Sequence, residues 1–120
     1  VREPGPRLIG NVSIETEDGI LAGFENHGGR THLGPEAEPL GRVLHGHGNN
    51  GSDGLEGVRR LNVIGTYLHG PLLPKNAGLA DRLIALALER REGTPVELQP
   101  LDDELELASH EGAKRAAERG

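Results

Sequence analysis

The order of the periodic segments is what most constrains the fold of this chain of 120 residues. Upstream of residue 70, apolar residues recur in short runs that turn-forming residues separate. Segment 7–16 alternates apolar and polar residues around Val12 and Ile14, which predicts a strand. Residues 17–19 predict a turn, and residues 20–24 predict a second short strand. The two strands are expected to form an antiparallel hairpin.

Further strand signals follow. Residues 42–46 predict a strand, and the Asn- and Gly-rich stretch 46–57 predicts turns, because these residues tolerate positive φ. Residues 58–68 predict a strand region that ends in a run apolar enough to be buried. Segment 25–31 is polar and rich in glycine, so it is interpreted as a functional loop or a bent strand.

Helical periodicity appears only after this point. Leu79, Leu83 and Leu86 predict a helix over residues 77–91, with Asn76 as its N-cap and Gly93 as its stop. Residues 94–100 predict an extended linker. Residues 101–119 predict a weaker helix that docks loosely or frays, since its apolar face is limited to Leu101, Leu105, Leu107 and Ala108.

The expected fold class is therefore α/β, with short antiparallel strands and C-terminal helices. Because strands come first and helices last, we interpret the chain as a half-domain whose sheet is completed by strands outside it. Residues 1–93 are expected to form the domain part, and residues 94–120 a linker and helical tail. With one Phe and one Tyr, the core must be aliphatic and thin. An open sheet edge would then favour association.

Composition excludes several classes of function. The formal net charge of −6 argues against nucleic-acid binding, which needs a basic surface. The longest apolar runs are too short to span a membrane, and the first residues lack signal-peptide character, so a cytoplasmic location is expected. Cysteine is absent, so the chain offers no disulfide, thiolate metal site or cysteine nucleophile.

His69 is the leading candidate for chemistry. It follows a buried-looking strand and precedes Gly70-Pro71, and α/β proteins place catalytic groups at strand ends of this kind. Histidine serves as a general acid or base near neutral pH. The alternative is a histidine that ends a strand and binds backbone. His45 and His47 have a spacing that metal sites use, but neither a carboxylate nor a cysteine stands at ligand spacing, so no metal is predicted.

Four motifs, in order, resemble class I (Cys–His type) glutamine amidotransferases of the cobyric-acid-synthase-like family. They are GFENHGGRT at residues 23–31, GHGNNG at 46–51 together with Glu56-Gly57, GTYLHGP at 65–71 and LLPKN at 72–76. The combination is similar to GatD-type glutaminase subunits of lipid II isoglutaminyl synthase. The resemblance covers about residues 7–88, and it implies the C-terminal half of a flavodoxin-like amidotransferase domain.

The resemblance implies a mechanism and partners. A cysteine thiolate would attack the carboxamide of L-glutamine, and His69 would activate the thiol and protonate the departing ammonia. The ammonia would pass to a MurT-like ligase subunit, which would use ATP and Mg to amidate D-glutamate of lipid II. No cofactor is expected in this subunit.

Two departures from the family pattern limit this expectation. The nucleophilic cysteine would precede Arg7, so the chain alone is predicted to be inactive. Many relatives place a glutamate two residues after the histidine, where this chain has Pro71. The residue that orients His69 must therefore come from elsewhere, and the resemblance points to an Asp on the partner.

Arg7 is the second candidate, for binding substrate. The segment Arg7-Leu8-Ile9-Gly10 matches a family pattern that contributes to glutamine binding, and a guanidinium can pair with an α-carboxylate. A solvated arginine is the alternative. Arg30 could take the same role, but a structural one, tying the Gly-rich loop to a carboxylate, is preferred. At the level of the whole chain, a cobyrinate-type amidotransferase domain and a non-catalytic, partner-docking half-domain remain alternatives.

Overall fold

A long antiparallel hairpin forms the centre of the molecule. The computed structural model describes residues 4–120. Strand β1 (Leu8–Thr16) pairs with β2 (Gly19–His27) in an unbroken register from Leu8 opposite His27 to Thr16 opposite Gly19. The predicted hairpin is confirmed. Strand β2 runs beyond its predicted end at Phe24, so the first part of the polar segment 25–31 is strand and the rest is loop.

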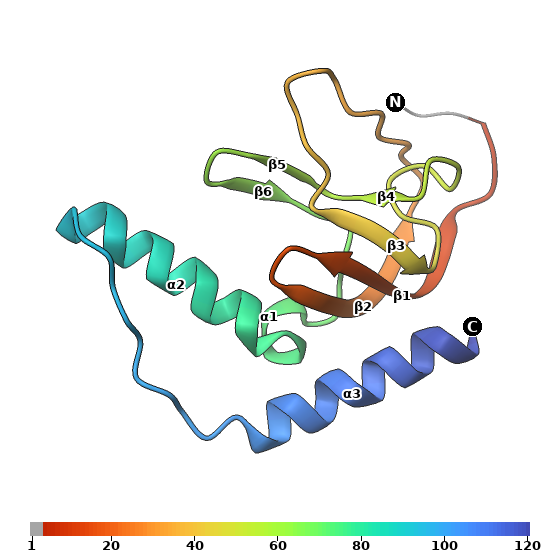
Figure 1. Cartoon of the computed structure of the whole chain (residues 1–120). Coiled ribbons are helices and arrows are strands. Elements are labelled where there is room, and N and C mark those ends of the chain that lie inside the picture. The colour runs from red at the N-terminus through yellow and green to blue at the C-terminus, as the bar shows by residue number, and fades with distance from the viewer. Residues whose placement is uncertain (1–3) are drawn as a thin grey trace.

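The other strands are short. Strand β3 (Gly41–His45) pairs with β1, and β4 (Leu55–Glu56) pairs with β3, so the sheet has the antiparallel order β2-β1-β3-β4. Strands β5 (Val58–Arg60) and β6 (Val63–Gly65) form a separate hairpin that projects from the main sheet (Figure 1). The strand predicted over 58–68 is therefore a hairpin with a reversal at Leu61, where φ is 55°.

The apolar run 63–68 was predicted to be buried, and this is wrong at its start. Val63 is 71% exposed, whereas Leu68 is only 5% exposed. The physical reason is that the chain reverses at residues 61–62 and carries Val63 out along the projecting hairpin, away from the main sheet. The position of the hairpin determines which residues of this run are buried, and the hydrophobicity of the residues alone does not predict that position.

Two longer helices follow a single helical turn in the chain. Helix α1 (Leu72–Lys75) connects the His69 segment to α2 (Ala77–Glu92), which matches the predicted helix. Gly93 ends α2 in the left-handed region, as predicted, and its N–H donates to Glu89 O at 2.8 Å. Asn76 occupies the N-cap position, but its side chain makes no capping hydrogen bond, because it binds β2 instead.

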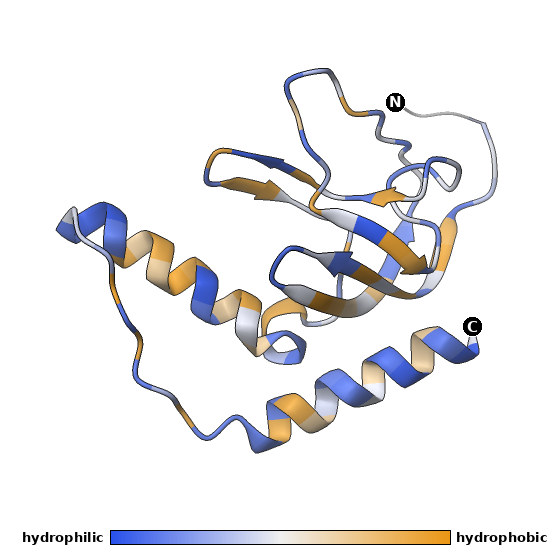
Figure 2. Cartoon of the chain, viewed as in Figure 1, coloured by the Kyte–Doolittle hydropathy of each residue, from blue (hydrophilic) through white to orange (hydrophobic). Residues whose placement is uncertain are grey.

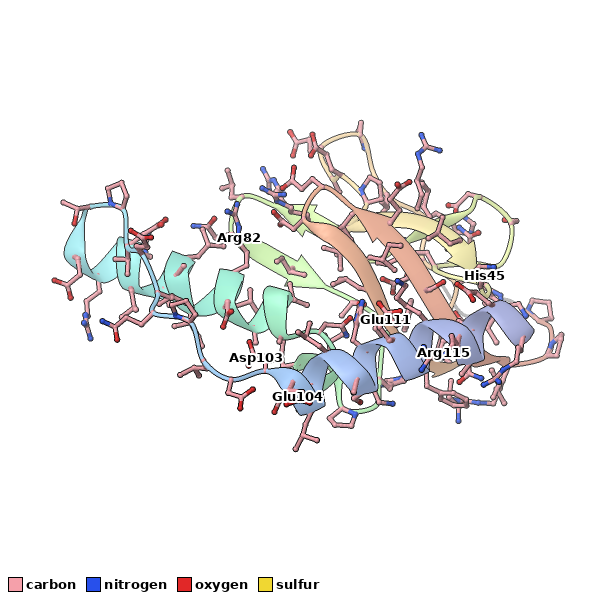
Figure 3. The ribbon with its side chains drawn as sticks, turned by 60° about the horizontal axis from the view of Figure 1, so that its bottom comes forward. His45, Arg82, Asp103, Glu104, Glu111 and Arg115 are labelled. Carbon is pink, nitrogen blue, oxygen red and sulfur yellow. The ribbon has the colours of Figure 1, made fainter. Side chains whose placement is uncertain are left out.

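Helix α3 (Glu104–Arg119) lies along β1, β2 and α1 (Figures 1 and 3). Its apolar face was predicted wrongly, because Leu101, Leu105 and Leu107 are 79%, 81% and 59% exposed. Ala117 is buried instead, at the far end of a helix that is hydrophilic over most of its length (Figure 2). His110 Nδ1 also lies 2.8 Å from Lys75 O.

The core is small and aliphatic, as the composition predicts. Val12, Ile14, Leu21, Leu68 and Leu79 form its buried cluster. The predicted fold class, α/β with short antiparallel strands and C-terminal helices, is confirmed. Within residues 4–120, none of the helices has the length and apolar character that a membrane crossing needs.

Candidate active site

His69 lies against the outer edge of β2. Its N–H donates to Phe24 O at 2.7 Å, and Phe24 N–H donates to His69 O at 3.2 Å, so one antiparallel bridge holds the histidine backbone. The preceding Leu68 is buried in the core cluster, whereas His69 is exposed. The core therefore anchors the segment, and the imidazole is presented to solvent at a strand edge.

This close approach depends on Gly23. A Cβ atom at residue 23 would lie 2.8 Å from His69 O and 3.0 Å from Leu68 Cδ2. Real Cβ atoms do not approach a backbone oxygen so closely, so any other residue would push the His69 segment away from β2. The glycine that opens the 23–31 motif thus serves the histidine of the 65–71 motif.

Tyr67 joins the same two motifs through its side chain. Its ring stacks on the imidazole of His27, with centroids 3.7 Å apart and planes 5° from parallel. Its hydroxyl lies 2.9 Å from Thr31 Oγ1. His27 Nδ1 lies 2.9 Å from Gly29 O, which fixes the ring against which Tyr67 packs.

Glu56 holds the backbone just before His69. Its side chain is 1% exposed, and it accepts from Tyr67 N–H at 2.7 Å and from the Thr66 hydroxyl at 2.9 Å. Burial raises the pKa of the Glu56 carboxyl above its ordinary value of 4.5, although the hydrogen bonds from Tyr67 and Thr66 act in the opposite direction. The charge of Glu25 adds to the upward shift.

Glu25 binds a different segment, the loop that follows β3. Its Oε1 accepts from His47 N–H at 2.6 Å and lies 2.7 Å from His47 Nδ1, and its Oε2 accepts from Gly48 N–H at 2.9 Å. His27 Nε2 is buried without a hydrogen bond, 3.8 Å from Glu25 Oε2. The 46–51 motif is therefore folded around a carboxylate of the 23–31 motif.

Asn49 and Asn50 act as loop-forming residues, as predicted. Asn50 Oδ1 accepts from Ser52 N–H at 2.9 Å and from Asp53 N–H at 3.0 Å, which closes a turn. Asn49 pairs with Gly57 in both directions, through Nδ2 to Gly57 O at 2.9 Å and from Gly57 N–H to Oδ1 at 2.8 Å. The loop is thereby joined to the end of β4.

Asn76 connects the fourth motif to β2. Its Nδ2 donates to Ala22 O at 2.8 Å, and its Oδ1 accepts from Ala22 N–H at 2.8 Å. It also donates to Leu72 O at 2.8 Å. The other three motifs that the sequence singled out therefore all contact the 23–31 motif or Ala22 directly before it.

Arg7 is bound to the same strand. Its Nε donates to Asn26 Oδ1 at 2.9 Å, and its Nη2 donates to Asn26 O at 2.9 Å. Asn26 is two residues from Phe24, one pleat repeat of about 7 Å along β2. Arg7 and His69 are thus attached to neighbouring outward positions of one strand. The predicted roles of both side chains stay predictions.

Arg30 ties the Gly-rich loop in place through hydrogen bonds to backbone carbonyls, whereas the sequence predicted a carboxylate partner. Its Nη2 donates to Pro6 O at 2.7 Å, and its Nη1 donates to Gly28 O at 3.3 Å and Gly29 O at 3.4 Å. These bonds fix the Gly-rich loop and the approach to β1. Arg30 as a whole residue is 7% exposed, which disfavours it as the ligand of a diffusing substrate.

The histidines considered for metal binding point to separate partners. His45 Nδ1 lies 3.0 Å from Ser13 Oγ, whereas His47 Nδ1 lies beside Glu25. In the part of the chain that the structure describes, no three His, Asp or Glu residues are grouped to hold a metal ion.

Sequence reasoning missed how Glu56 and Glu25 act. Both were noted inside motifs, but as parts of a resemblance and without a role. The signal that could have found Glu56 is its position directly before Gly57, which has φ 70° and pairs with Asn49. The direction of the Glu56 side chain, toward Thr66 and Tyr67, is visible only in the structure.

Comparison with known proteins identifies relatives. The family model described as "CobB/CobQ-like glutamine amidotransferase domain" matches residues 3–77. The GatD subunit of lipid II isoglutaminyl synthase (glutamine-hydrolyzing) from Staphylococcus aureus is 47% identical over 102 residues, and that of Streptococcus pneumoniae is 46% identical over 99. These matches cover 84% and 81% of this chain, respectively.

A more distant relative is the probable cobyric acid synthase of Methanothermobacter thermautotrophicus, 35% identical over 113 residues, which cover 93% of this chain and 21% of that protein. The chain spans 41% and 38% of the lengths of the two GatD subunits.

Proposed function

This chain belongs to the family of CobB/CobQ-like glutamine amidotransferase domains, and we propose that it forms the part of a glutaminase subunit that carries the catalytic histidine, His69. The observation that carries the proposal is the bridge between His69 and Phe24. It places an exposed imidazole on a backbone that the core and the neighbouring motifs hold still. A general acid or base requires that combination of access and fixed position.

The proposed reaction is the hydrolysis of L-glutamine to glutamate and ammonia. The chain contains no cysteine, so a cysteine from outside these 120 residues must supply the nucleophile. His69 would take the thiol proton as the sulfur attacks the carboxamide carbon, and would give that proton to the nitrogen as the C–N bond breaks. Water would then release glutamate from the thioester. By itself the chain is proposed to be inactive.

Arg7 is proposed to bind the α-carboxylate of glutamine. Its Nε and Nη2 are used by Asn26, which holds the guanidinium beside β2. The position of Asn26, one pleat repeat from Phe24, supports this role, because glutamine is long enough to extend from Arg7 toward the His69 position. The exposure of Arg7 supports it as well.

The ammonia is proposed to serve a MurT-like ligase subunit that amidates D-glutamate of lipid II with ATP and Mg, in the cytoplasm. What supports this destination is the identity of 46–47% to two GatD subunits, against 35% to a cobyric acid synthase. Because Pro71 stands where many class I amidotransferases have a glutamate, an Asp of the ligase subunit is proposed to orient His69.

The test is glutaminase activity of the assembled enzyme, with this segment in its natural protein and with its ligase partner. His69→Ala should lower kcat about 10²–10⁴-fold, the usual contribution of positioned proton transfer. Arg7→Ala should raise KM for glutamine and leave kcat nearly unchanged. Unchanged hydrolysis in His69→Ala would refute the assignment. Amidation of cobyrinate instead of lipid II would move the chain to the alternative enzyme.

A further inference from the structure

The segment that delivers His69 lacks a regular strand partner. Residues 66–68 lie between the end of β6 and the His69 bridge, outside any helix or strand. Half-buried or buried N–H groups in such a segment need other acceptors, because an unpaired buried donor is costly. The position of His69 therefore depends on whatever binds these N–H groups.

Three consecutive N–H groups each have an acceptor of a different kind. Tyr67 N–H donates to the Glu56 carboxylate at 2.7 Å, and Leu68 N–H donates to the Thr66 hydroxyl oxygen at 3.0 Å. His69 N–H donates to Phe24 O at 2.7 Å. The Thr66 hydroxyl in turn donates to Glu56, at 2.9 Å from Oε2 and 3.1 Å from Oε1. Two of the three acceptors thus depend on one carboxylate.

The carboxylate itself is fixed. Glu56 is paired with Gly41 in the sheet and is 1% exposed, so water cannot readily replace it. The next residue, Gly57, is bound to the buried Asn49 in both directions. A carboxylate held in this way at both backbone and side chain acts as a rigid anchor for residues 66–68.

We propose that Glu56 is the positioning residue for His69: its buried carboxylate fixes Thr66 and Tyr67, and through them the backbone from which the imidazole projects. This inference rests on the proposed function of His69. Glu56 does not touch the reacting atoms. It acts because a displacement of about 1 Å in a catalytic group can lower the rate about 10²-fold, even when its cause is remote.

The experiment compares variants in the assembled glutaminase with its ligase partner. Glu56→Gln keeps the size of the side chain but removes its charge, and it replaces one of the two carboxylate oxygens that face Thr66 and Tyr67 by an NH2 group, which cannot accept a hydrogen bond. We expect kcat to fall about 10- to 100-fold while KM for glutamine changes less than about threefold, since Arg7 is bound elsewhere. Rates are expressed per active site, titrated with a cysteine-reactive glutamine analogue, so loss of folded enzyme does not count.

Glu25→Gln is the matched control. Glu25 is equally buried and also accepts backbone N–H groups, but it binds the loop at His47 and Gly48. Its kcat should stay within about twofold of the parent. An equal fall in both variants would overturn the proposal, because it would show a general effect of losing a buried charge.

A second pair of variants decides the matter if Glu56→Gln does not fold. Thr66→Val preserves shape but removes the acceptor of Leu68 N–H and the donor to Glu56, so kcat should fall. Thr66→Ser restores the hydroxyl, so kcat should recover. Equal kcat in the two Thr66 variants would overturn the proposal.

The His69→Ala variant separates failure of the proposed function from failure of the Glu56 proposal. If His69→Ala is fully active, the proposed function has failed. If His69→Ala loses activity but the Glu56 and Thr66 variants keep theirs, the positioning role of Glu56 is wrong.

Discussion

At the scale of single residues, the site contains two groups that ordinarily lower the stability of a folded protein. A buried carboxylate such as Glu56 must lose its hydration, and a glycine inside a strand, such as Gly23, weakens the strand. Both residues are explained by their contacts with the segment that ends at His69. Glu56 supplies acceptors to the irregular run before His69, and Gly23 provides the space that lets His69 O reach β2.

Gly23→Ala is the direct test of that space. The added methyl would lie 2.8 Å from His69 O, a backbone atom that cannot move away alone. We expect the free energy of unfolding to fall by about 1–3 kcal/mol, as in other overpacked sites. Denaturation in urea, followed by circular dichroism, measures the change.

Gly78→Ala is its control. A Cβ atom there would have no heavy atom within 4 Å, and the residue lies in α2. It should leave stability unchanged or raise it by up to about 1 kcal/mol, because Ala favours helix. If Gly23→Ala were as stable as Gly78→Ala, the close approach of β2 to His69 would not matter for stability.

At the scale of elements, the sequence predicted those whose pattern is local. Strand β1 and helix α2 have clear periods of their own, and Gly93 ends the helix where its conformational freedom predicts. The β5–β6 reversal was not predicted, because Leu61 is not a turn residue, yet it adopts φ 55°. Tertiary placement, not local preference, sets that turn.

For the candidate site, the sequence predicted which motifs matter but not how they meet. The 65–71 and 23–31 motifs were singled out, and they are in contact, because His69 pairs with Phe24 and Tyr67 contacts His27 and Thr31. Asn76 was assigned to capping, whereas it binds Ala22 across the fold. These contacting residues lie far apart in the chain, and residue type alone does not predict which of them will pair.

Helix α3 gives the prediction at this scale. Ala117 is its buried residue and the leucines at its start are exposed, so Ala117→Glu would bury a charge on a helix that contacts β1 and β2. We expect a loss of about 1–3 kcal/mol in the free energy of unfolding. Ala108→Glu, on the exposed side of the same helix, should change it by less than about 0.5 kcal/mol. Equal losses, measured by thermal and urea denaturation, would contradict the docking of α3.

At the scale of the whole molecule, the shape is more open than that of an independent domain. The radius of gyration is 15.1 Å, and the extents are 46 × 34 × 18 Å. A compact domain of this length should have a radius of about 13.6 Å. The accessible surface of 7848 Å² likewise exceeds the value of about 6300 Å² expected for a protein of this mass.

Part of this surface is an apolar groove away from His69. It has a volume of about 270 Å³ and lies between the start of α2, α3 and the β1–β2 turn, where Ile20, Leu21 and Leu79 line it. His69 is not among its lining residues, so we do not connect the groove with catalysis. It is surface that a larger assembly could cover.

Association of the chain alone follows from this shape. Leu61 and Leu105, at 85% and 81%, have the highest exposed fractions among the large hydrophobic residues of the described chain, and we expect them to take part in self-association. Sedimentation velocity should show a concentration-dependent rise above the monomer mass. Leu61→Asn combined with Leu105→Lys should lower it without loss of stability, because Asn also tolerates the left-handed backbone at residue 61. A parent chain that stays monomeric at high concentration would show that these leucines are not sites of contact, and that the open surface is stable in water as it stands.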